Sequence, residues 1–158
     1  MISALGLLVL AGFVFYIQSR PLYALYFLIL HVVLDALDGS LARYMKCDTD
    51  AGAIVDMVCD HTGMIIVTGT LMYQGLIQQN LGVAYILLYT LLVLLITTLN
   101  RLHIPLRFAI RTKYFLYVFV ALRAIWGVNY FDTAIAIFII LMIAPTAIGL
   151  LKLSRYRQ

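Results

Sequence analysis

The stretch DALDGSLARYMKCDTDAGAIVDMVCDHTG, from Asp35 to Gly63, carries six of the seven acidic residues in this chain. All seven are aspartates, and only Asp132 lies elsewhere. The rest of the chain is strongly apolar, since 65% of its 158 residues are hydrophobic and 11% are charged, against about 25% charged residues in an ordinary soluble domain. This composition is typical of an integral membrane protein that concentrates its polar chemistry in one place.

The apolar segments predict an all-α fold, a six-transmembrane-helix bundle that forms a single domain over residues 1–158. A bilayer core about 30 Å thick needs roughly 20 apolar residues per helix. Pro21 and several polar segments separate the runs, and the first run lacks the basic start of a signal peptide, so we expect it to be retained. The expected helices span residues 2–18, 22–43, 52–74, 82–100, 113–129 and 132–153.

The basic residues support six spans. With that number, nine of the eleven Lys and Arg residues share one side of the membrane with both termini. Only Arg20 and Arg123 lie on or near the other side. Because cytoplasmic segments carry an excess of Lys and Arg, we expect a multi-pass protein of the cell membrane. Both termini and the aspartate-rich stretch would lie at its cytoplasmic face.

The aspartates form two pairs with helical spacing. Asp35 and Asp38 are three residues apart, Asp56 and Asp60 are four apart, and residues at these spacings share a helix face. A short connection predicts that the two helices are antiparallel neighbours, so the pairs can face each other. Buried carboxylates that repel one another need protons or divalent cations to offset their charge. The small residues Gly39, Ala42 and Gly52 leave room for a ligand beside the carboxylates, and Arg43 supplies a cation that suits a phosphate. These residues favour a metal-bound phosphate over a proton path.

Together these residues read D35-x2-D38-G39-x2-A42-R43-x8-G52-x3-D56-x3-D60. This pattern resembles the signature of the CDP-alcohol phosphatidyltransferase family at all eight of its positions. The resemblance implies a six-helix membrane enzyme, usually a homodimer, with a polar cavity open to the cytoplasm. Such an enzyme transfers the phosphatidyl group of a CDP-linked lipid to an alcohol and releases CMP, and we expect no nucleic-acid partner.

The resemblance also implies roles for individual residues. Asp35, Asp38 and Asp56 would hold two divalent ions, Mg²⁺ or Mn²⁺, that bridge the CDP pyrophosphate. Asp60 would complete the metal shell and act as general base on the acceptor hydroxyl. The CDP and phosphate site would comprise Asp35, Asp38, Gly39, Ala42, Arg43, Gly52 and Asp56.

The acceptor is a weaker inference. The basic segment from Arg101 to Lys113 is explained by the excess of cations in cytoplasmic loops, but Arg101, Arg107 or Arg111 could instead bind a phosphate on the acceptor. This second interpretation weakly favours glycerol phosphate or inositol phosphate over serine or another lipid. Asp48 is interpreted as a capping or loop residue, and His31 as a core histidine rather than a ligand.

Two rival functions use the same aspartates. A cation or proton transporter would spread polar groups across the membrane and often has repeated halves, whereas this chain concentrates its acids at one face. A catalytically inactive family member that acts as a subunit would not be expected to keep the whole signature. Both remain alternatives to the enzyme.

Overall fold

A computed structural model describes residues 2–44, 49–104, 106 and 112–156, and only the backbone of residues 2–4, 39, 42, 43, 50 and 53. Within these ranges the chain folds into six α-helices, as the sequence predicts. They are α1 (Ile2–Tyr16), α2 (Pro21–Tyr44), α3 (Asp50–Tyr73), α4 (Gln79–Arg101), α5 (Thr112–Trp126) and α6 (Phe131–Tyr156).

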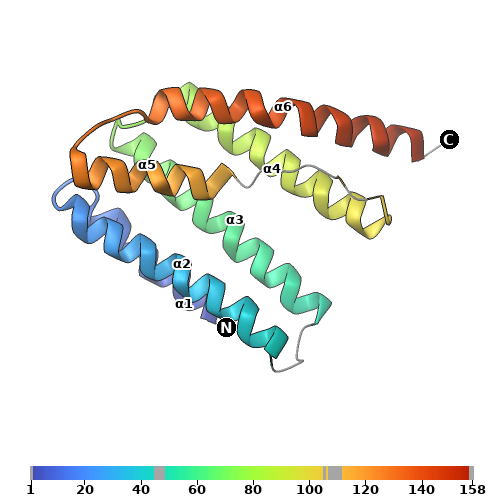
Figure 1. Cartoon of the computed structure of the whole chain (residues 1–158), viewed down its shortest axis with the longest axis horizontal. Coiled ribbons are helices and arrows are strands. Elements are labelled where there is room, and N and C mark those ends of the chain that lie inside the picture. Colours follow the sequence, from blue (N-terminus) through green and yellow to red (C-terminus); the bar gives the residue numbers. More distant parts are fainter. Residues whose placement is uncertain (1, 45–48, 105, 107–111, 157–158) are drawn as a thin grey trace.

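The helices form two pairs joined by two single helices (Figure 1). The α1–α2 pair makes the most extensive contact, followed by α4 with α6. Helix α3 contacts α1 and α4, while α5 contacts α2 and α6. The connections α1–α2, α3–α4 and α5–α6 gather at one end, on the left of Figure 1, and both termini point toward the other end.

The helix ends have local causes. Proline suits the first position of a helix because it lacks an N–H and has a fixed φ, and Pro21 begins α2. Gly75 follows α3 with a φ of 67°, and Gly127 follows α5 with a φ of 70°. Glycine adopts such positive φ angles without steric cost, so α5 ends at Trp126 rather than at the expected residue 129.

One apolar core runs through the bundle, and large apolar side chains also cover its outside. The core includes Leu10, Phe13, Leu28 and Met64 from the first three helices and Leu116 from α5. Exposed apolar side chains are distributed over all the helices. In a soluble protein such a surface would be a liability, whereas in a bilayer it faces lipid.

Four helices are long and apolar enough to span a membrane, namely α2, α3, α4 and α6. Helices α1 and α5 have 15 residues each, which corresponds to about 22 Å at 1.5 Å per residue. That is shorter than a bilayer core of about 30 Å. Within the described ranges the structure therefore contains four candidate membrane spans, and the other two expected spans form shorter helices.

Candidate functional site

Helix α2 carries the first aspartate pair near its C-terminal end. Asp35 and Asp38 are both partly exposed. Asp35 lies within electrostatic range of Asp38, of Asp56 on α3 and of Lys113 on α5. Gly39, Ala42 and Arg43 lie in the following turns of α2, where the structure describes the backbone alone.

Helix α3 carries the second pair near its start. The N-cap is Thr49, whose Oγ1 accepts a hydrogen bond from the Gly52 N–H at 3.1 Å. Asp48, the expected capping or loop residue, lies outside the described residues. Among the atoms that the structure describes, a Cβ atom on Gly52 would have only this Oγ1 within 4 Å. Gly52 lies one turn before Asp56.

The two motif helices are less tightly paired than the sequence suggests. Helices α2 and α3 contact each other, but each packs more extensively on α1. Figure 1 shows the two helices running in opposite directions. The two aspartate pairs therefore belong to helices that share α1 as a support.

Lys113 joins the aspartates from a third helix. Its ammonium group forms an ion pair with Asp60 Oδ1. The lysine side chain is 2% exposed and that of Asp60 is 30% exposed. Lys113 also lies within electrostatic range of Asp35 and Asp56. One buried cation therefore connects the start of α5 to acidic residues on both motif helices.

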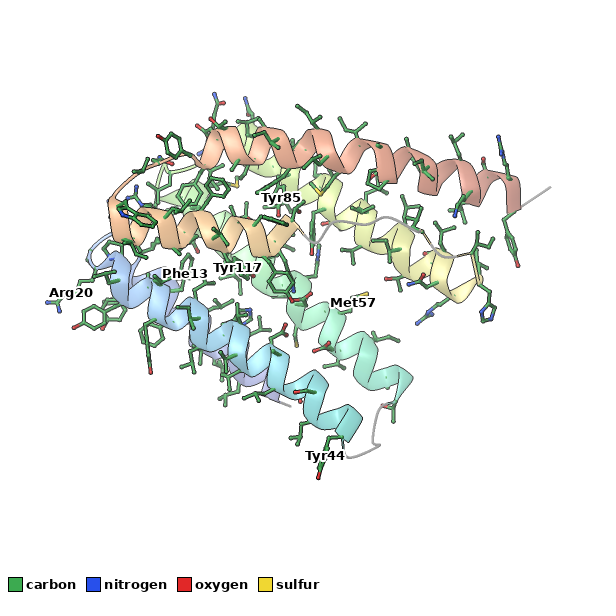
Figure 2. The ribbon with its side chains drawn as sticks, viewed as in Figure 1. Phe13, Arg20, Tyr44, Met57, Tyr85 and Tyr117 are labelled. Carbon is green, nitrogen blue, oxygen red and sulfur yellow. The ribbon has the colours of Figure 1, made fainter. Side chains whose placement is uncertain are left out.

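Hydrogen bonds and ring contacts hold the start of α5 in place. Thr112 begins this helix, and its hydroxyl lies 3.2 Å from the Tyr85 hydroxyl on α4. The Thr112 hydroxyl also lies 3.7 Å from Met142 Sδ on α6. Lys113 follows directly, with its ammonium 4.5 Å from the Tyr114 ring centroid. Figure 2 shows Tyr85 and Tyr117 beside the α5 ribbon in the middle of the molecule.

His61, which follows Asp60, fixes α3 against α4. Its ring stacks on Tyr89 with the centroids 5.7 Å apart, and its Nε2 lies 3.0 Å from Thr90 Oγ1. The Thr90 hydroxyl already donates to the Ile86 carbonyl. The Nε2–H of His61 therefore donates to Thr90, and this contact orients the helix turn that presents Asp60.

His31 lies one helical turn before Asp35 and is only 3% exposed. Added Cβ atoms on Gly6 of α1 and Gly63 of α3 would approach its ring nitrogens to 3.1 and 2.9 Å. Two glycines on separate helices thus leave room for this ring. The placement confirms the expectation of a core histidine.

The basic segment between α4 and α5 is described only in part. Arg101 is exposed and ends α4. Arg107 and Arg111 lie outside the described residues. Among the three residues expected to bind an acceptor, the structure therefore places Arg101 alone.

A sequence model of the family described as CDP-alcohol phosphatidyltransferase matches residues 1–152. The chain belongs to this family. It is therefore a membrane enzyme of phospholipid synthesis that carries out CDP-alcohol phosphatidyl transfer. No curated protein and no solved structure matched the chain.

The family typically uses a divalent metal ion. Among the residues that the structure describes, no three His, Cys or Asp side chains are grouped so that they could hold one ion. The donors nevertheless suit Mg²⁺ or Mn²⁺, because these ions prefer carboxylate oxygens. The cluster also holds a positive charge already, the Lys113 ammonium. The aspartates of this phosphatidyltransferase thus fit a divalent ion in donor type alone.

From the sequence alone, Lys113 is only one of several cations in the basic segment between Arg101 and Lys113. Its contact with Asp60 joins residues 53 positions apart, through packing of α5 on α2 and α6. One signal was available in the sequence, because Lys113 opens an expected span rather than lying within the preceding loop. A cation at the start of an apolar helix needs a partner or a route to water.

Proposed function

We propose that this phosphatidyltransferase carries out its reaction at the aspartates of α2 and α3. The phosphatidyl group, or a related lipid-phosphate group, of a CDP-linked lipid would pass to an alcohol acceptor, and CMP would leave. The observation that carries the proposal is the buried Lys113 ammonium on Asp60, within electrostatic range of Asp35 and Asp56. This contact supports the proposal that these three aspartates belong to one polar site.

Two divalent ions, Mg²⁺ or Mn²⁺, would be held by Asp35, Asp38, Asp56 and Asp60. When bound, such ions offset the negative charge that builds on the pyrophosphate and stabilise the CMP leaving group. The space beside Gly52 leaves room for the nucleotide. Gly39, Ala42 and Arg43 would complete the CDP site, where an arginine suits a phosphate.

Asp60 is the proposed general base. A carboxylate within hydrogen-bond reach of the acceptor hydroxyl can take up its proton as the new phosphate ester forms. The ion pair engages Oδ1 with Lys113, and a carboxylate has a second oxygen for the proton. Lys113 would thus orient the base and offset its charge. In this role it is a positioning residue.

The acceptor would be a small alcohol, with a phosphorylated one weakly favoured. Arg101 lies exposed at the end of α4, and Arg107 and Arg111 follow in the basic segment. These cations could bind a phosphate on glycerol phosphate or inositol phosphate. We place the site at the cytoplasmic face of the cell membrane and expect a homodimer. The molecular mass of the detergent-solubilised protein tests the dimer.

CMP release tests the reaction. The purified protein would receive a CDP-linked lipid, Mg²⁺ or Mn²⁺, and each member of a panel of alcohols. We expect release with one acceptor, abolished by a chelator. The Asp60→Asn variant should lose about 10²- to 10⁴-fold in rate, the usual contribution of a general base.

Asp132→Asn is the matched control, because Asp132 is the one aspartate outside the stretch from Asp35 to Gly63. Its Oδ1 accepts a hydrogen bond from the Gln78 N–H at 2.8 Å, and asparagine keeps an acceptor oxygen there. This variant should retain full activity. If no acceptor gives CMP and no metal-dependent binding of the CDP-lipid is seen, the proposed site is wrong, and a transporter or an inactive subunit would explain the aspartates better.

A further inference from the structure

A cavity lies far from the aspartates, where α1 joins α2. Its volume is about 790 Å³, within the range of about 300–1,000 Å³ found for ligand pockets. Figure 2 shows Arg20 at this end of the molecule and Tyr44, the last residue of α2, at the opposite end. The lining residues are Tyr16, Arg20, Leu22, Tyr23, Tyr26 and Phe27.

The aromatic wall of this cavity is held in place. The rings of Tyr16 and Phe27 stack in parallel at 5.8 Å, and Tyr23 lies against Tyr16 at 5.7 Å. Phe27 packs directly on the backbone of α1, since a Cβ on Gly12 would come within 2.6 Å of its ring. A wall supported in this way keeps its shape without a ligand, which lowers the entropic cost of binding.

The charge of the cavity is positive. None of its six lining residues is acidic, and Arg20 is exposed. The guanidinium carbon of Arg20 lies 5.5 Å from the Tyr23 ring centroid, so the ring limits its movement. Helix α2 begins at Pro21, and the N-terminal end of a helix carries partial positive charge. The side of the cavity formed by Arg20 and the start of α2 therefore suits an anion.

The remaining surface of the cavity suits hydrocarbon. Leu22 is 63% exposed and Tyr26 is 62% exposed, at the end of a helix long and apolar enough to cross a membrane. Tyrosine and arginine at such a position are typical of the level of lipid headgroups. A free phosphate ion would contact Arg20 alone and leave this apolar surface uncovered. A phospholipid would cover it with an acyl chain.

We propose that this cavity binds an anionic phospholipid of the surrounding bilayer, as a lipid site separate from the catalytic one. Arg20 bonds the headgroup phosphate, and the acyl chain follows Leu22, Tyr26 and Phe27. A second copy of the chain suits the cavity less well. In a two-fold interface the same patch faces itself, so two Arg20 side chains would be brought together and repel each other.

Native mass spectrometry tests the site with phosphatidylglycerol and phosphatidylcholine as probes. The whole protein would be released from micelles that contain each lipid. We expect phosphatidylglycerol to be retained in preference to phosphatidylcholine. Arg20→Gln should weaken its retention about tenfold, the usual effect of losing one hydrogen bond to a charged group. Excess inorganic phosphate should not displace it.

Arg155→Gln is the matched control, since Arg155 is an exposed arginine near the other end of the bundle, in the last turn of α6. It should leave lipid retention unchanged. Tyr26→Ala removes an exposed wall residue without touching the core, and it should weaken retention even if Arg20→Gln fails to fold. Equal retention of both lipids, equal losses in the Arg20 and Arg155 variants, or conversion of a dimer to a monomer by Arg20→Gln would overturn the proposal.

Discussion

At the scale of single residues, the aspartates of the signature were visible in the sequence because their types and spacing carry the chemistry. Asp35, Asp38, Asp56 and Asp60 stand out as carboxylates at helical spacing in an apolar chain. Lys113 did not stand out in this way, because its role depends on packing between helices distant in sequence. Spacing along one chain segment predicts a shared helix face, but it does not reveal which cation a third helix supplies.

The ion pair makes a prediction about stability. Lys113→Met leaves the Asp60 carboxylate partly buried without its cation. Breaking a buried pair costs about 3–5 kcal/mol, and we expect the lower end because Asp60 remains 30% exposed. Adding Asp60→Asn should recover part of the loss, with a coupling of about 0.5–3 kcal/mol. Thermal unfolding in detergent of the unaltered protein, the two single variants and the double variant measures this double-mutant cycle. Strictly additive effects would show that the two side chains do not interact.

At the scale of helices, the sequence predicted type and order well. Pro21, Gly75 and Gly127 separate apolar runs and so leave few alternatives for where the helices begin and end. The observed helices follow the expected ranges closely. The relation between helices was harder to predict. The short connection suggested that α2 and α3 pack directly, yet α1 contacts both more extensively. Connection length limits which helices can be neighbours, whereas side-chain shape decides how closely they pack.

Two helical glycines give a matched prediction about packing. A Cβ on Gly12 would meet the Phe27 ring at 2.6 Å, while a Cβ on Gly69 would meet nothing within 4 Å. Gly12→Ala should therefore cost about 1–3 kcal/mol through overpacking. Gly69→Ala should stabilise α3 by up to about 1 kcal/mol, because alanine is the better helix former. Unfolding in detergent compares them, and equal effects would contradict the close contact of α1 with α2.

At the scale of the whole molecule, the arrangement of the helices defines two ends. The connections α1–α2, α3–α4 and α5–α6 lie at one end, and the termini and the aspartate motif lie toward the other (Figure 1). The proposed lipid site lies with the three connections, and the proposed catalytic site lies on the aspartate side. Nine of the eleven basic residues are expected on that same side. The length of α2 thus separates the proposed lipid site from the proposed metal-binding aspartates.

This separation predicts how the protein is oriented in the membrane. Ser19 is exposed in the α1–α2 connection, and Ser154 is exposed near the end of α6. In a variant with Cys47 and Cys59 replaced by alanine, Ser19→Cys should react with an impermeant maleimide added outside intact cells. Ser154→Cys should react only after permeabilisation, because the excess of cations keeps its end cytoplasmic. The reverse pattern would place the aspartates on the outer face, away from a cytoplasmic supply of CDP-lipid. Labelling of both cysteines from outside would contradict the odd number of crossings that six spans place between Ser19 and Ser154.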